Sequence, residues 1–187
     1  MQDIAQETLI KAQEDDLGPF ESIYKETSGF AYNVAFRIVN NKQDAEEVVQ
    51  DVFLNIYHNL KHFRFQSSFK TWVYRITVNC AINHLKKMAR EKNRIKEYGN
   101  HLMQTGETSQ APEAEKMNDG QEEMISSLLG TLDLNQRACI VLRNIEGLSY
   151  REISDTLKVN INTVRTRLKR AREKLLDFGK EGMKDEL

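Results

Sequence analysis

Apolar residues recur at helical spacing through two long stretches of this 187-residue chain, and this periodicity most constrains its fold. The clearest stripe consists of Ala45, Val48, Val49, Val52, Phe53 and Ile56. Steps of three and four residues place such a stripe on one face of a helix. The alternation of apolar and polar residues that predicts strands is not found, and only Pro19 and Pro112 are present to interrupt helices. We therefore predict an all-α protein.

The two periodic stretches are separated by residues 99–121, which lack periodicity and are rich in Gly, Ser, Thr, Gln and acidic residues. This composition is typical of a flexible linker. We predict two small helical domains at residues 1–98 and 122–187, joined by this acidic linker. Within the first domain, Asn41 is expected to cap the helix that follows it, and a long helix is expected from about Phe69 to Lys96.

The composition excludes several classes of protein. No apolar run approaches the roughly 18–20 residues of a transmembrane helix, and the N-terminus lacks the basic flank and hydrophobic stretch of a signal peptide. Two widely spaced cysteines, Cys80 and Cys139, fit a reducing compartment better than a disulfide framework. We therefore predict a cytoplasmic protein with no direct membrane insertion.

The net charge of −1 conceals an uneven distribution of charged residues. Acidic residues outnumber basic ones in residues 1–57, whereas residues 60–98 carry many Lys and Arg against only Glu91 and Glu97. A second basic block lies at residues 158–174. Two separate basic blocks predict two nucleic-acid contacts, although each alone also fits a solvated helix face.

The second basic block belongs to a pattern of two short helices joined by a turn. Ser149 is the expected N-cap of the first helix, and Glu152 lies at the capping-box spacing. A tight turn is expected at residues 158–160, with Asn160 capping the second helix. These are the parts of a helix-turn-helix.

The second helix presents a polar and cationic face opposite its apolar stripe. The residues assigned to this DNA-reading face are Asn162, Thr163, Arg165, Thr166, Arg167, Lys169 and Arg170. A central strip of such a helix can read base edges while flanking cations hold phosphates. The alternative is an ordinary helix pair with a solvated basic face.

A second DNA-binding constellation is predicted in the N-terminal domain. Its residues are Phe63, Arg64, Phe65, Trp72, Arg75, Asn79, Asn83 and Lys86. The last four share one face of the predicted long helix. Aromatic rings beside cations suit single-stranded DNA, whose unstacked bases can rest on rings or enter pockets. Trp72 also fits a core position, and Phe63 and Phe65 fit either role.

The polar face of the helix that contains the apolar stripe is acidic. It carries Glu47, Gln50 and Asp51, which cannot favour DNA and suit a basic protein partner. Considered alone, this face also fits ordinary solvation.

These segments resemble a known family. Residues 44–53 (DAEEVVQDVF) and 69–79 (FKTWVYRITVN) resemble conserved region 2 of the extracytoplasmic-function (ECF) sigma factors. Residues 147–153 (GLSYREI) and 163–172 (TVRTRLKRAR) resemble their region 4. With the linker, the resemblance covers nearly the whole chain. It implies a sigma factor of two domains, region 2 at residues 1–98 and region 4 at residues 122–187.

The resemblance implies a role for each face. Glu47, Gln50 and Asp51 match the family's docking site for the clamp helices of the polymerase β′ subunit. Residues 62–68 match the loop that captures a flipped base of the −10 element, and the face from Arg75 to Lys86 matches the part that melts and reads that element. Residues that match the −35-reading positions are Arg165, Thr166, Lys169 and Arg170.

The implied partners are core RNA polymerase, through the β′ clamp helices and the β flap, promoter DNA and an anti-sigma factor. A stress-response role also follows from the resemblance. This sequence departs from the family pattern at Asn83 and Lys86, where Asp and Arg are usual, at Lys158 and Asn162, which replace glycines, and at Ser154, which replaces alanine.

Two other interpretations are open. A helix-turn-helix regulator that acts without polymerase would explain the C-terminal half alone. A metalloprotein would use His58 and His62, which have i, i+4 spacing but no obvious third ligand. The sequence contains no nucleophile–base array or phosphate-binding glycine loop, so we expect no enzymatic activity, small-molecule substrate, metal or cofactor. It leaves open whether the two domains pack together.

Overall fold

The computed structural model describes residues 4–14, 17–102 and 120–182, and the side chains of residues 4–14, 17–95 and 124–178. Every regular element in these residues is helical, as the sequence predicts. The N-terminal unit contains α1 (Gln6–Gln13), α2 (Leu17–Val39), α3 (Lys42–Asn59), the 3₁₀ turn η1 (Leu60–His62) and α4 (Phe69–Leu102). The C-terminal unit contains α5 (Gly120–Gly130), α6 (Leu134–Ile140), the π-helical turn η2 (Val141–Ile145), α7 (Tyr150–Leu157) and α8 (Ile161–Gly182).

The N-terminal unit is a bundle in which α2, α3 and α4 pack against one another. The predicted stripe of α3 lies at its centre, because Ala45, Val48, Val52 and Ile56 are fully buried. The side chain of Asn41 caps α3 by accepting a hydrogen bond from the Asp44 backbone N–H at 3.0 Å, as predicted. Such a cap contributes about 1 kcal/mol.

The ends of two helices differ from the sequence-based expectation. α4 continues past Lys96 to Leu102, and α1 was not expected, since the periodic pattern begins only at Phe20. Pro19 lies in the first turn of α2, where the missing N–H has no intrahelical acceptor. Pro112 and most of the predicted linker, residues 103–119, lie outside the described residues.

The C-terminal unit contains the predicted helix-turn-helix. Ser149 and Glu152 form both hydrogen bonds of a capping box at the start of α7. The turn after α7 places Lys158 in the left-handed region at φ 50°, and Asn160 caps α8 by accepting from the Asn162 N–H at 2.8 Å. α7 and α8 bury a shared core. Its fully buried residues include Ile153, Val164, Leu168 and Ala171.

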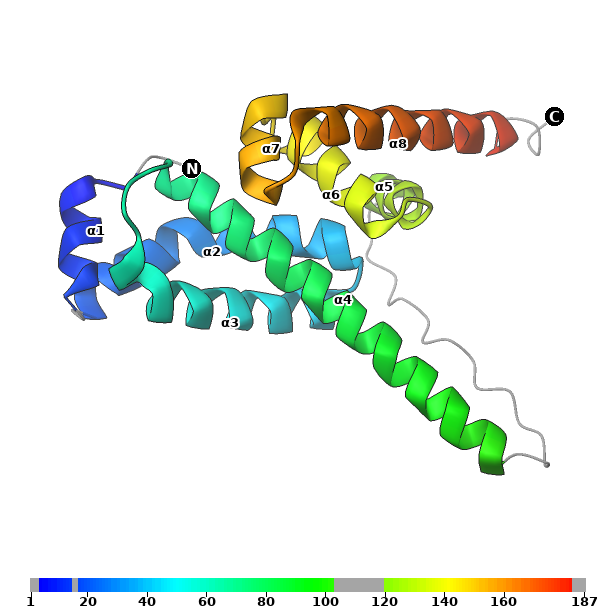
Figure 1. Ribbon diagram of the computed structural model, residues 1–187, viewed down its shortest axis with the longest axis horizontal. Coiled ribbons are helices and arrows are strands. Elements are labelled where there is room, and N and C mark those ends of the chain that lie inside the picture. The colour runs from blue at the N-terminus through cyan, green and yellow to red at the C-terminus, as the bar shows by residue number, and fades with distance from the viewer. Residues whose placement is uncertain (1–3, 15–16, 103–119, 183–187) are drawn as a thin grey trace.

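The two units pack against each other, which the sequence left undecided. Figure 1 shows α5 to α8 lying beside the bundle, while the far end of α4 extends away from both. The buried guanidinium of Arg137 donates to the Ile38 carbonyl at 2.7 Å and, within its own unit, to the carbonyls of Gly130 and Leu132. Ser126 bonds Asn40 across the same interface.

A second contact between the units joins α4 to the end of η2. The hydroxyl of Tyr74 donates to the Glu146 carboxylate at 2.7 Å. Burial, and then this carboxylate, raise the pKa of the Tyr74 phenol above its usual value.

No described helix is both long and apolar enough to cross a bilayer.

Candidate nucleic-acid interface

The loop between η1 and α4 rests on a cluster of four aromatic rings. The Phe63 ring lies 4.9 Å from Phe65, 5.7 Å from Phe69 and 5.1 Å from Trp72, measured between centroids. Edge-to-face and tilted contacts of this kind stabilise a cluster beyond its burial alone. The loop is therefore packed against an apolar cluster formed by these rings.

The structure separates the two roles that the sequence left open for these rings. Phe63 and Trp72 are 7% and 8% exposed, so both belong mainly to the cluster. Phe65 is 39% exposed and has a φ of 55°, which is unusual for a bulky residue. Backbone held in such a conformation is often found where a loop binds something. Arg64, beside it, is exposed.

The predicted DNA face of α4 continues from this loop. Arg75 is half-buried at the loop end, while Asn79, Asn83 and Lys86 are exposed at steps of three and four residues. These four side chains therefore follow one side of the helix, as the spacing predicts.

The acidic face of α3 is exposed beside α4. Glu47, Gln50 and Asp51 are all exposed and border a groove of about 590 Å³ that Asn83 of α4 also lines. His84 lies at the base of this face, with Nε2 3.1 Å from the Asp44 carboxylate and Nδ1 4.0 Å from that of Glu47. The acidic face and the predicted DNA face of α4 are thus neighbours.

The recognition helix α8 presents most of its predicted face to solvent. Asn162, Arg165, Thr166, Lys169 and Arg170 are exposed, whereas Thr163 and Arg167 are half-buried. Arg165 donates to the Asn162 side chain at 3.0 Å, and Lys169 lies 3.8 Å from Glu173. Both contacts are at the surface and can exchange for contacts with DNA at little cost.

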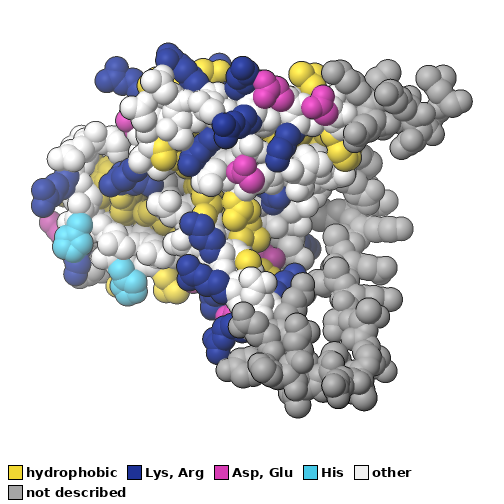
Figure 2. Space-filling view, turned by 45° about the vertical axis from the view of Figure 1, so that its right-hand side comes forward, with side chains coloured by type: hydrophobic (Ala, Val, Ile, Leu, Met, Phe, Trp, Pro, Cys, Tyr) yellow, Lys and Arg dark blue, Asp and Glu magenta, His cyan; other side chains and the backbone are white. Residues whose placement is uncertain are grey.

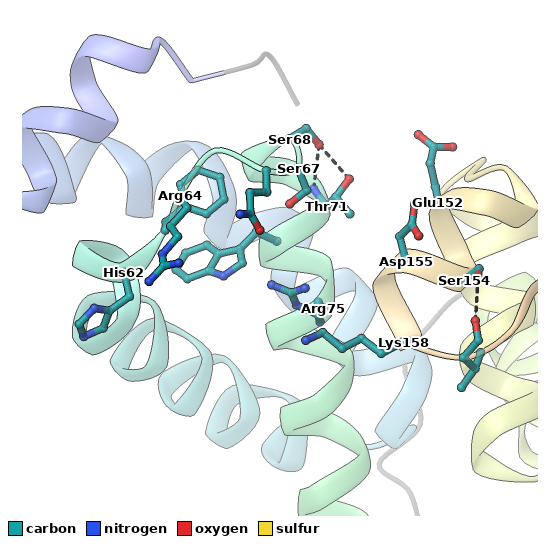
Figure 3. Close-up of a pocket in the computed structure, with 14 residues that line it drawn as sticks. His62, Arg64, Ser67, Ser68, Thr71, Arg75, Glu152, Ser154, Asp155 and Lys158 are labelled. Atoms are coloured by element: carbon teal, nitrogen blue, oxygen red, sulfur yellow. Dashed lines mark hydrogen bonds between the residues drawn. The ribbon is translucent and has the colours of Figure 1, made fainter.

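A cavity of about 980 Å³ separates the loop from the helix-turn-helix. The loop and α4 line one wall, which includes Arg64, Trp72 and Arg75, and α7 with its turn lines the other. Figure 3 shows side chains of the two walls facing each other, among them Arg75 and Lys158. The second wall also carries Glu152, whose pKa is lowered by hydrogen bonds from Ser149.

Several residues of this arrangement were not singled out as functional from the sequence. They are Gln13, His84, Arg137 and Glu146, which make long-range contacts, and Asp155, which lines the cavity. No local pattern marks the first four, because their partners lie tens of residues away. In Figure 2, Lys and Arg side chains run from the unit at the top, where α8 lies, down the centre of the view.

The two histidines considered for a metal site, His58 and His62, are exposed. Within the described part of the chain, no group of three or more His, Cys, Asp or Glu side chains is placed to hold a metal ion. The expectation of a protein without a metal stays a prediction.

Both units match models of known protein families. Residues 23–91 match Sigma-70 region 2, and residues 122–175 match Sigma-70 region 4. The chain is 31% identical over 177 residues to the RNA polymerase sigma-H factor of Pseudomonas aeruginosa, a match that covers 90% of each chain. It is 33% identical over 142 residues to the ECF RNA polymerase sigma-E factor of Haemophilus influenzae, covering 71% of this chain and 73% of that protein.

Solved structures share the fold. CnrH, solved in complex with the cytosolic domain of CnrY, superposes with a TM-score of 0.66 at 24% identity, covering 93% of this chain and 96% of that one. RpoE of Bartonella quintana, solved in complex with the anti-sigma factor NepR, gives 0.63 at 22% identity, covering 86% and 96%. The family models and the relatives agree with the resemblance found in the sequence, and the chain belongs to the extracytoplasmic-function sigma factors.

Proposed function

We propose that this chain binds core RNA polymerase and directs it to promoters, reading the −35 element with α8 and melting and reading the −10 element with the loop and α4. One observation carries the proposal: a single chain exposes an acidic helix face, an aromatic loop beside cations and a cationic helix in a helix-turn-helix. A DNA-binding regulator that acts alone would need only the last of these.

The −10 site is proposed at the loop and the adjoining face of α4. Phe65 is the exposed ring on which an unstacked base can rest, and the cavity beside Trp72 can receive a flipped base. Arg64 and Arg75 would neutralise phosphates on either side of this base. Asn79, Asn83 and Lys86 extend this face along α4.

The −35 site is proposed at the exposed face of α8. Arg165, Thr166, Lys169 and Arg170 can reach base edges and phosphates in a major groove, with Asn162, Thr163 and Arg167 at its margins. Because much of this binding comes from neutralised phosphates, the free chain is expected to bind promoter DNA weakly and with steep salt dependence.

The polymerase site is proposed at Glu47, Gln50 and Asp51, which would meet the β′ clamp helices, with the β flap as a second contact.

The proposed domain limits are region 2 at residues 1–98, a linker at 99–121 and region 4 at 122–187. A cytoplasmic location, a role in stress response and control by an anti-sigma factor are proposed as well. The last is supported by the solved complex of RpoE with NepR. Sigma factors are not enzymes.

The packed arrangement of the units cannot serve both promoter elements at once. About 25 base pairs, the nominal separation of the −35 and −10 positions, span about 85 Å of DNA at roughly 3.4 Å per base pair. In this structure the −10 loop and the helix-turn-helix line one cavity of about 980 Å³. We therefore propose that the units separate when polymerase and promoter are bound, with the linker keeping them at high effective concentration.

In vitro transcription with purified core polymerase tests the proposed function. Wild-type chain is expected to give promoter-selective transcripts. Trp72→Ala is expected to impair opening of the DNA, measured by permanganate footprinting, whereas Arg170→Ala is expected to weaken promoter binding at the −35 element. Lys42→Ala, an exposed cation outside both sites, is the control. A chain that gives no selective transcripts with core polymerase would contradict the proposal.

A further inference from the structure

The loop assigned to the −10 element is held in place by a side chain from α1. Gln13, at the C-terminal end of α1, donates from Nε2 to the backbone carbonyls of Leu60 and Phe63, each at 2.9 Å. These carbonyls lie 47 and 50 residues further along the chain. Leu60 is the first residue of η1, the last turn before the loop, and Phe63 directly follows that turn.

The position of Gln13 is itself fixed by packing. Leu9 and Ala12 are 3% and 7% exposed, and α1 contacts both α2 and η1. An amide group has two N–H donors, and both are used here. A planar amide with two fixed acceptors also fixes the direction of each carbonyl. Gln13 therefore sets the path of the backbone at Leu60 and Phe63.

That backbone leads directly to the exposed ring. The Phe63 N–H donates back to the Leu60 carbonyl at 2.9 Å, and the Phe63 ring lies in the aromatic cluster. Two residues later the chain reaches Phe65, with its φ of 55°. A sparsely populated backbone conformation persists only where its surroundings determine it. Of these surroundings, the two hydrogen bonds from Gln13 come from outside the stretch matched to Sigma-70 region 2.

We propose that Gln13 is a positioning residue for promoter opening, which acts by holding the loop backbone in the conformation that presents Phe65 to a flipped base. This inference rests on the proposed −10 role of the loop. Gln13 itself is not proposed to touch DNA. Gln13 orders the loop before DNA binds, so the entropic cost of ordering the loop is not added when the base is captured.

Gln13→Glu tests the inference, because it keeps the shape of the side chain and removes the amide donor. Gln6→Glu is the matched control, since Gln6 is an exposed residue of the same helix and undergoes the same change of charge. Gln13→Met removes the donor without adding charge. It shows whether any effect of Gln13→Glu comes from the new charge or from loss of folding rather than from loss of the donor. Each variant is first compared with the wild type in thermal stability and in affinity for core polymerase.

The measurement is the rate of opening of a duplex promoter by the holoenzyme, followed by fluorescence of 2-aminopurine next to the flipped position. We expect Gln13→Glu and Gln13→Met to slow opening about tenfold, since each loses two hydrogen bonds of modest strength, and Gln6→Glu to leave it unchanged. On a promoter with an abasic site at the flipped position, the Gln13 variants and the wild type are expected to open at equal rates. A merely structural role would slow both promoters alike.

Phe65→Ala separates failure of this inference from failure of the proposed function. If Phe65→Ala slows opening and the Gln13 variants do not, the inference is wrong and the −10 role of the loop stands. If Phe65→Ala also leaves opening unchanged, Phe65 does not hold the flipped base, and both the inference and the −10 role proposed for Phe65 are wrong. Equal slowing of the Gln13 variants on the intact and abasic promoters would likewise overturn the inference.

Discussion

The hydrogen bond between Tyr74 and Glu146 makes a quantitative prediction about the packing of the two units. The phenol of Tyr74 is 1% exposed and lies 2.7 Å from the carboxylate, a short bond with a charged acceptor. Tyr74→Phe removes the donor and leaves the ring, whose edge-to-face contact with Phe30 is made by carbon atoms. The substitution therefore changes one contact between the units and leaves the core of the bundle filled.

The expected effect follows from the character of that bond. Hydrogen bonds to charged groups contribute about 1.5–3 kcal/mol, and the lower end applies here because Glu146 is only half-buried. About 1.4 kcal/mol corresponds to a tenfold change in an equilibrium, so the ratio of packed to separated units should fall about tenfold. The contacts made by Arg137 and Ser126 are unchanged by this substitution.

Single-molecule energy transfer measures this ratio in the free chain. Dyes can be attached at Glu26→Cys on α2 and Lys174→Cys on α8, both exposed, in a chain with Cys80 replaced by Ala while Cys139 is buried. Tyr57→Phe, at an exposed tyrosine of α3, is the control. If Tyr74→Phe gives the same distribution of transfer efficiencies as Tyr57→Phe, this bond does not hold the units together.

Three further predictions follow from individual groups. The pKa of the Tyr74 phenol is raised above its usual 10.0 in the folded chain, so the protonated phenol stabilises the fold fully below pH 10 and less as the pH rises further. Above pH 10, the melting temperature of Tyr74→Phe should therefore fall less steeply with pH than that of the wild type. Lys158→Gly should stabilise the chain by about 0.5–1 kcal/mol in urea unfolding, since glycine relieves the left-handed strain at φ 50°, whereas Lys158→Ala should not. Burial raises the pKa of the Cys80 thiol to about 11, from 9.0, so iodoacetamide at pH 8 should alkylate it about a hundredfold more slowly in the native chain than in urea.

Features that depend on neighbouring residues were predicted well. The caps at Asn41, Ser149 and Asn160 are all present, because each needs only a side chain within three residues of its backbone partner. The buried stripe of α3 and the helix-turn-helix follow from periodicity in the same way. α1 was missed because it is short and buries few residues, among them Leu9 and Ala12, too few to produce a clear stripe.

Features that depend on distant residues were not predicted. Arg137 resembles any helix-surface arginine in the sequence, yet it is buried and bonds a carbonyl 99 residues away. The aromatic residues near the loop could be assigned either to the core or to DNA from their order alone. Only the packing assigns Phe63 and Trp72 mainly to the cluster and leaves Phe65 exposed.

The same long-range contacts that the sequence conceals divide into two kinds with opposite consequences for promoter binding. Contacts within the N-terminal unit, such as those of Gln13, hold the −10 loop ready and need not change when DNA binds. Contacts between the units, such as that of Tyr74 with Glu146, must break before elements about 85 Å apart can be bound together. Strengthening the first kind should therefore favour promoter opening, whereas strengthening the second should oppose it. A cross-link between the units should consequently abolish transcription from a duplex promoter while leaving binding of an isolated −35 duplex intact, because the reading face of α8 is exposed in the packed form.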